Sequence, residues 1–200
     1  MPEALAFPYQ RQIGAHRVHA ERPVGPAMDA ILARADARLA TSPIAASGMG
    51  KRIFLTDGGW RWRVLVLRSA GAFAISRPLS EVIVVNRSDI AADRVINGAA
   101  VAGDRRLSGT LAHEMTHGLI RRHFGTLASI GFPAWKVEGY CDHVAGGGSL
   151  DDATAARLTA AGQAPPALRY YQGRKRVEQL LAGRGGSVDA LFAGKDELAR

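Results

Sequence analysis

The sequence predicts a single α+β domain, and three observations lead to that prediction. A chain of 200 residues that is 47% hydrophobic holds enough apolar material for one sizeable core, but not for two independent ones. Short β-rich stretches separated by glycine turns are confined to residues 51–86. From residue 87 onward, apolar residues recur at helical spacing. We therefore expect one domain over residues 1–200, with a small, mainly antiparallel sheet in its N-terminal half and helices in its C-terminal half.

The first 40 residues predict an extended lead-in followed by a helix. Residues 1–25 contain three prolines and two glycines, which favours irregular or extended structure with one short strand over residues 13–18. A helix is expected over residues 27–39, because apolar residues recur there at helical spacing, at Met28, Ile31, Leu32, Ala35 and Leu39. Thr41-Ser42-Pro43 ends this run.

The β-rich region predicts four strands, over residues 52–55, 60–67, 72–76 and 82–85. Arg61 and Arg63 alternate with apolar residues, which is the period of a half-buried strand. Turn residues at Asp57-Gly58-Gly59 and at Gly71 suit antiparallel connections. No further strand is predicted after Asn86. Five helices are expected instead, over residues 107–123, 134–144, 151–161, 166–181 and 187–199.

Charge bears on the class of partner. The formal net charge is +8 and the pI is about 10.4, mostly from arginines scattered between Arg11 and Arg200. No aromatic residues interleave with the basic ones as base stacking would require, so specific nucleic-acid binding is not expected. A basic surface would still favour acidic partners or anionic membranes. The oligomeric state stays open.

Cysteine content and apolar runs bear on the compartment. Cys141 is the only cysteine, which excludes an internal disulfide and zinc sites built from four thiolates. Residues 1–10 lack the basic start and apolar run of a secretory signal, and no segment approaches the roughly 20 apolar residues of a membrane span. We therefore expect a soluble protein, with the cytoplasm favoured.

Two histidines stand four residues apart in the segment His113-Glu114-Met115-Thr116-His117, inside a helical pattern. Four residues are about one helical turn, so both imidazoles leave the same face and can bind one zinc ion. Glu114 follows the first histidine and reaches the water on that metal. Zinc lowers the pKa of its bound water toward about 7, and a carboxylate can take the proton as that water attacks a carbonyl. The segment therefore predicts zinc-dependent hydrolysis.

The surroundings of this segment favour a rigid site. Apolar neighbours would bury the helix, and Gly118 permits close packing: Leu111, Ala112, Met115, Leu119 and Ile120. The alternative is a helix with two surface histidines and no metal.

A second predicted helix supplies a third ligand. It begins just after Pro133 and carries Glu138, which follows His117 by 21 residues. That connection lets the second helix cross beside the first and complete a three-ligand site, with the fourth position left for water. Asp142 lies one turn beyond Glu138, where it can accept the other ring N–H of a ligating histidine.

In these two helices the sequence resembles the gluzincin metallopeptidases. In that family a helix with two histidines four residues apart precedes a second helix with a ligand glutamate. The closest likeness is to thermolysin-like and peptidase MA-like domains, and it covers residues 107–144 with specific motifs. The resemblance implies a zincin-like fold, one Zn²⁺ ion held by His113, His117 and Glu138, and Glu114 as general base. It also implies that Asp142 binds His113 from outside the set of metal ligands. The implied substrate is a peptide or protein.

His123 stands where metzincin peptidases place a third histidine ligand, six residues after His117. That pattern requires a glycine at the position of Ile120, because the chain must leave the helix sharply there. It also requires a methionine turn, and no methionine follows Met115. We therefore interpret His123 as a residue near the end of the helix.

Several other residues are candidates for minor roles. Hydrolysis of a peptide requires a hydrogen-bond donor to the developing oxyanion. The candidates are Tyr170, Tyr171, Tyr140 and His143. Cys141 is expected to point away from the metal, as a small buried side chain. Asp104 or Ser108 is expected to cap the metal helix.

Two hypotheses about function follow from the sequence. The first is a zinc metallopeptidase in which Glu114 activates water. The second is a zinc-stabilised binding or regulatory module with little or no peptidase activity, because the chain has few residues left to build a large substrate cleft. A weaker third idea is that the basic surface binds nucleic acid or anionic lipid.

Overall fold

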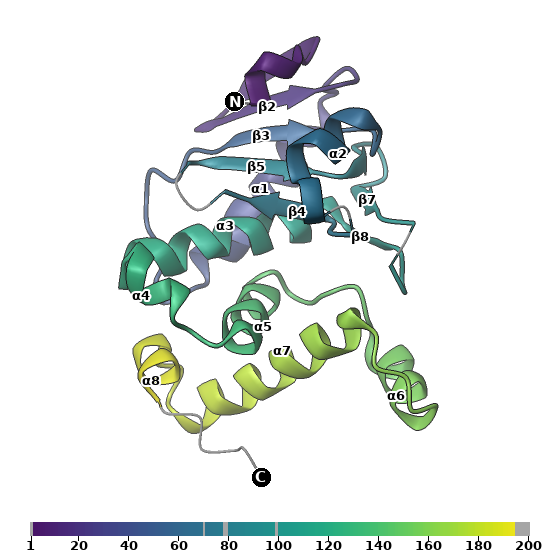
Figure 1. Cartoon of the computed structure of the whole chain (residues 1–200). Coiled ribbons are helices and arrows are strands. Elements are labelled where there is room, and N and C mark those ends of the chain that lie inside the picture. Colours follow the sequence, from purple (N-terminus) through teal and green to yellow (C-terminus); the bar gives the residue numbers. More distant parts are fainter. Residues whose placement is uncertain (1, 70, 78–79, 99, 195–200) are drawn as a thin grey trace.

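A computed structural model describes residues 2–69, 71–77, 80–98 and 100–194 of the chain (Figure 1). Its larger sheet has the strand order β1-β2-β3-β5-β4. These strands are β1 (Tyr9–Ile13), β2 (His16–Ala20), β3 (Arg52–Leu55), β4 (Ala74–Ser76) and β5 (Val82–Val85). The outer pairings, β1 with β2 and β4 with β5, are antiparallel, whereas β2–β3 and β3–β5 are parallel. The predicted α+β class is confirmed, and the centre of the sheet is parallel.

Three expectations about strands were wrong. The predicted lead-in contains the β1–β2 hairpin. The predicted strand over residues 60–67 is mainly helix α2 (Trp60–Val66), whose buried residues Trp62, Leu65 and Val66 follow helical spacing. The stretch after Asn86 holds a three-stranded antiparallel sheet of β6 (Arg87–Asp89), β7 (Arg94–Ile96) and β8 (Asp104–Arg106). These strands are three residues long and largely polar, so they produce no hydrophobic period.

The larger sheet is covered on both faces. In β3, Ile53 and Leu55 belong to the main core, while Phe54 points into a smaller core under α2. In β5 the same alternation places Ile83 and Val85 in the main core. This alternation follows from the period of two in a strand, and it explains why the central strands are apolar throughout.

The predicted helices after residue 106 are present, the first four with bounds close to those expected, whereas the last ends at Ala193 because Gly194 is extended. They are α3 (Leu107–Phe124), α5 (Ala134–Val144), α6 (Asp152–Ala160), α7 (Pro166–Gly183) and α8 (Val188–Ala193), with a short α4 (Thr126–Ile130) after α3. Residues 195–199 of the last predicted helix lie outside the described residues. The predicted N-terminal helix is α1 (Ala27–Ala40), and it packs on α3.

Helix α3 lies between the larger sheet and the C-terminal helices α5 and α7 (Figure 1). It contacts β4 on one side and α5 on another, and α5 in turn packs on α7. Most of its residues from Leu107 to Ile120 are buried, so the helix is fixed on nearly all sides. Any side chain on α3 that faces α5 is therefore held rigidly.

Two glycines set the distance between α5 and α7. A Cβ atom added at Gly139 would lie 2.5 Å from the carbonyl oxygen of Gly173, and one added at Gly173 would lie 2.8 Å from the carbonyl oxygen of Trp135. Only glycine permits this backbone contact. The contact lies directly beside Glu138, the predicted third ligand on α5, and therefore fixes the helix at that point.

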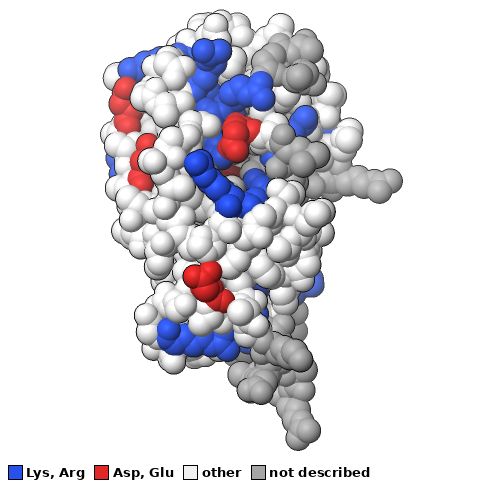
Figure 2. All heavy atoms as spheres, turned by 90° about the vertical axis from the view of Figure 1, so that its left-hand side faces the viewer, with Lys and Arg blue, Asp and Glu red and all other residues white. Residues whose placement is uncertain are grey.

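Basic and acidic residues are mixed on the face seen in Figure 2. Lys and Arg side chains gather on its upper half around acidic ones, and a further basic stretch lies low on the same face. The basic residues there do not form one uninterrupted surface. Among the described residues, no helix combines the length and apolar character that a membrane span would need.

Candidate metal centre

Helix α3 presents His113 and His117 side by side toward α5. Their ring centroids are 5.1 Å apart and the rings are tilted by 76°. The His113 side chain is 7% exposed and that of His117 is 16% exposed. The spacing of four residues therefore places both imidazoles on one face, as predicted from the sequence.

The start of α3 is capped differently from the prediction. Asp104 lies in β8, and the Ser108 hydroxyl donates to Asp93 Oδ2 at 2.8 Å. Asp93 Oδ1 also accepts from the backbone N–H of Ser108 at 2.8 Å. The carboxylate that satisfies the helix terminus therefore comes from the β6–β7 turn, which a local capping pattern cannot reveal.

Helix α5 brings the Glu138 carboxylate to both imidazoles. Glu138 Oε2 lies 3.2 Å from His113 Nε2 and 3.7 Å from His117 Nε2. The three predicted ligands thus converge although they come from two helices. Carboxylate oxygen and imidazole nitrogen are both ligands that zinc accepts.

Asp142 fixes the orientation of His113. The His113 Nδ1–H donates to Asp142 Oδ1 at 2.7 Å, and Arg105 Nη2 donates to the same oxygen at 2.8 Å. Asp142 is fully buried. With Nδ1 occupied in this way, Nε2 of His113 is the nitrogen that faces Glu138.

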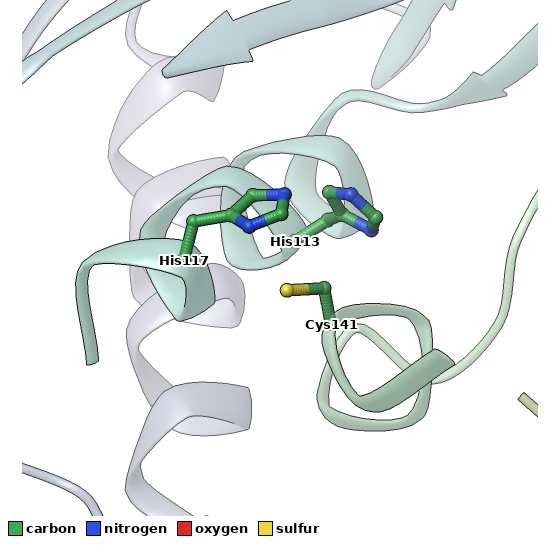
Figure 3. Close-up of side chains that lie close together, drawn as sticks. All are labelled: His113, His117 and Cys141. Atoms are coloured by element: carbon green, nitrogen blue, oxygen red, sulfur yellow. The ribbon is translucent and has the colours of Figure 1, made fainter. Parts of the chain in front are cut away.

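Cys141 does not point away from this cluster, so that expectation was wrong. Ligand atoms of His113, His117 and Cys141 all lie within 4.8 Å of one another, a group that could hold a metal ion. Figure 3 shows the Cys141 thiol reaching from α5 toward the two imidazoles of α3. The physical reason is that residues three and four positions after Glu138 share its face of the helix, so Cys141 faces α3 as Asp142 does.

The charges in the cluster are strongly coupled. Burial disfavours the charged form of His113, but the attraction and hydrogen bond of Asp142, together with the hydrogen bond of Glu138, raise its pKa to about 10. Burial lowers the pKa of His117. Burial opposes ionisation of Glu138 as well, yet the hydrogen bond from His113 and the charge of His117 hold its pKa below the usual value.

Asp142 and Cys141 respond to burial in different ways. Burial disfavours the charged carboxylate of Asp142, but the charges of Arg105 and then His113 hold its pKa well below the usual range. Burial raises the pKa of the Cys141 thiol, and the carboxylate of Glu138 raises it further. Without a metal, the cysteine is therefore a neutral thiol behind the histidines.

The cluster opens into a cleft of about 500 Å³. Glu114 is buried and lines this cleft together with both histidines and Glu138. The opposite wall includes all of β4, the edge strand of the larger sheet. An edge strand has unpaired backbone N–H and C=O groups, which can pair with an extended peptide.

Tyr170 alone among the four oxyanion candidates lines the cleft. Burial and the nearby carboxylate of Glu138 raise its pKa to about 12, so it remains a hydroxyl donor. Tyr171 instead donates to Asp152 Oδ1 at 2.9 Å, and Tyr140 is buried with its hydroxyl 2.7 Å from Ser42 Oγ. His143 lies 3.7 Å from Glu178 and does not line the cleft.

His123 is outside the cluster, at the far end of α3. Its Nε2 lies 2.7 Å from Asp189 Oδ1, which follows the start of α8. This position agrees with its interpretation as a residue near the end of the helix.

Two cationic residues near the cluster were missed by the sequence reasoning. Arg105 holds Asp142, and Arg121 lines the cleft one helical turn beyond His117. The spacing of Arg121 from His117 is visible in the sequence and was the available signal. Arg105 reaches Asp142 across 37 residues of sequence, so no local pattern indicates it.

Comparisons with protein-family models, with curated proteins and with solved structures each found no match.

Proposed function

We propose that this chain is a zinc-dependent hydrolase of the gluzincin type that cleaves peptide bonds. One observation carries the proposal: a single carboxylate oxygen of Glu138 lies within 3.7 Å of the Nε2 atoms of both His113 and His117. Three donors that converge at the wall of a cleft, with one side open, are the donor set of a catalytic zinc site.

His113, His117 and Glu138 would hold the zinc ion. We favour Glu138 over Cys141 as the third ligand because its side chain is 27% exposed and faces the cleft, whereas Cys141 is fully buried with a raised pKa. Asp142 would keep His113 in the tautomer that offers Nε2, since Nδ1–H donates to its carboxylate. When bound, zinc supplies Lewis acidity toward water and a carbonyl oxygen.

The protein residues around the donors would perform the remaining tasks. Glu114 lines the cleft beside His113 and would hold the proton removed from the attacking water. Tyr170 has a hydroxyl in the same cleft and would donate a hydrogen bond to the developing oxyanion. The free edge of β4 would align an extended peptide across the site.

The decisive experiment compares the wild type with Glu114→Gln. Both proteins are loaded with zinc, and their zinc content and their cleavage of a mixed library of unfolded peptides are measured. We expect equal zinc content, and a loss of cleavage of about a hundredfold or more in the variant, because the base is removed while the ligands stay. Equal cleavage by both proteins would refute the role of Glu114. Full zinc binding without cleavage by the wild type would favour the binding or regulatory module instead.

A further inference from the structure

A second polar pocket adjoins the metal cluster at Arg105, which lines both this pocket and the cleft. Its volume is about 450 Å³. Three arginines line it, Arg38 from α1 and Arg105 and Arg106 from β8, together with residues of the glycine-rich loop after α5. Among the residues that the structure describes, none that lines this pocket is acidic.

Two of the three arginines have no carboxylate partner among the described residues. Within the part of the chain that the structure describes, the guanidinium groups of Arg38 and Arg106 take part in no ion pair or hydrogen bond. Arg105 donates to Asp142 Oδ1 and, at 3.3 Å, to the carbonyl oxygen of Gly147. Arg38 and Arg106 therefore line one small pocket without a counter-charge among the described residues, an arrangement that attracts an anion.

Two carboxylates bound to residues around this pocket have other partners. Asp142 is bound by Arg105 and His113, and Asp93 is bound by Arg34 and by Ser108. Asp93 is therefore satisfied through both of its oxygens, whereas only Oδ1 of Asp142 has partners and its Oδ2 is buried without a hydrogen bond from any described residue.

The loop that closes the pocket requires glycine. Gly146 has φ +76°, and a Cβ atom there would collide with the guanidinium of Arg38. A Cβ atom at Gly148 would lie 2.7 Å from Asp142 Oδ2. These glycines let the backbone approach while Arg38 keeps its place at the pocket wall.

We propose that this pocket binds a phosphate group, either free phosphate or the phosphate of a small monoester. Guanidinium groups present parallel N–H donors that match phosphate oxygens, and two unpaired guanidinium groups can share one such anion. The pocket is larger than one phosphate ion, so a monoester can enter with its phosphate on the arginines. This site is separate from the proposed zinc site and does not depend on hydrolysis.

The test measures binding by isothermal titration calorimetry at constant ionic strength. Inorganic phosphate and phosphoserine are the two ligands, and potassium chloride added to the same ionic strength is the blank. We expect one phosphate site per chain in the wild type and a rise in Kd of about tenfold or more in the Arg38→Ala, Arg106→Ala double variant. Tighter binding of phosphoserine would identify a monoester as the ligand, and tighter binding of inorganic phosphate would identify the free anion.

A charge-matched control separates a built site from general attraction to a basic protein. Arg63→Ala with Arg157→Ala removes the same charge from two exposed positions on α2 and α6. This variant is expected to bind phosphate as the wild type does, and circular dichroism confirms that each variant folds. No binding by the wild type, or an equal loss of binding in both double variants, would overturn the proposal.

Discussion

At the scale of residues, one face of α5 determines what the cluster can bind. Glu138, Cys141 and Asp142 lie at positions i, i+3 and i+4, so all three face α3. Asp142 is used to hold His113 and Arg105. The choice of third ligand is therefore between the carboxylate of Glu138 and the thiol of Cys141.

We predict that Glu138, not Cys141, controls zinc affinity. Glu138→Ala should weaken zinc binding by more than about a hundredfold, because one of three protein ligands is lost. Cys141→Ala should change it by less than about threefold, because a buried neutral thiol contributes packing only. Competition with a chromogenic chelator measures both affinities. The opposite ranking would show that the ligand set is two histidines and the cysteine.

The metal-free protein should lose stability at alkaline pH through His113. Its pKa is raised to about 10 in the folded protein, against 6.5 for the unconstrained side chain. Because the pKa of His113 is raised on folding, its protonated imidazole stabilises the folded protein fully below pH 6.5. This stabilisation is lost as the pH rises from 6.5 through about 10. The loss should be of the order of several kcal/mol. Urea unfolding at pH 6 and pH 10, compared between the chelator-treated wild type and His113→Gln, measures it.

Two outcomes would contradict this pH dependence. One is an equal change in the free energy of unfolding of wild type and His113→Gln between the two pH values. The other is a His113 ring resonance that titrates near pH 6.5 in the metal-free protein, which would mean that Asp142 does not hold the imidazolium.

At the scale of elements, the contact between α5 and α7 places the third ligand. Gly139 directly follows Glu138, and its backbone lies against Gly173 of α7. The register of α5 is therefore set by packing on the side away from the metal. A shift of α5 would move Glu138 from the histidines.

We expect Gly173→Ala to lower the free energy of unfolding by about 1–3 kcal/mol, because the new methyl group would lie 2.8 Å from the carbonyl oxygen of Trp135. Gly183→Ala is the matched control on the same helix, since nothing lies within 4 Å of a Cβ there. That control should be neutral or slightly stabilising, because alanine favours helix. Urea denaturation measures both. Equal stability of the two variants would show that α5 and α7 can separate without cost.

The sequence predicted elements well where one period was unambiguous. The helix over residues 134–144 has the predicted bounds, since it begins after Pro133 and ends before Gly146. The prediction of a strand over residues 60–67 was wrong because two patterns overlap there. The alternating arginines match the period of a strand, whereas the buried residues Trp62 and Val66 match the period of a helix. At the site, local spacing indicated His113, His117 and Glu138 as neighbours. It could not indicate Arg105, because that contact depends on how β8 meets α5.

At the scale of the whole molecule, the cluster joins two layers. Helices α3 and α5 contribute to one hydrophobic core, in which α3 packs against β4 of the larger sheet and α5 against α7. Ligands from α3 and α5 would therefore link the sheet layer to the C-terminal helices through one ion. Metal binding at such a junction should stabilise both layers together.

We predict that zinc raises the melting temperature of the whole chain in a single transition. Free zinc at about a thousand times its Kd stabilises the folded state by about 4 kcal/mol, which for a chain of this size corresponds to about 8–16 °C. Differential scanning calorimetry of the metal-free protein, with and without zinc, measures the rise, and a chelator should reverse it. The His113→Ala, His117→Ala double variant should show no such rise. If zinc instead raised the melting temperature of that variant as much as that of the wild type, the ion would be binding elsewhere, and the two layers would not be joined at these histidines.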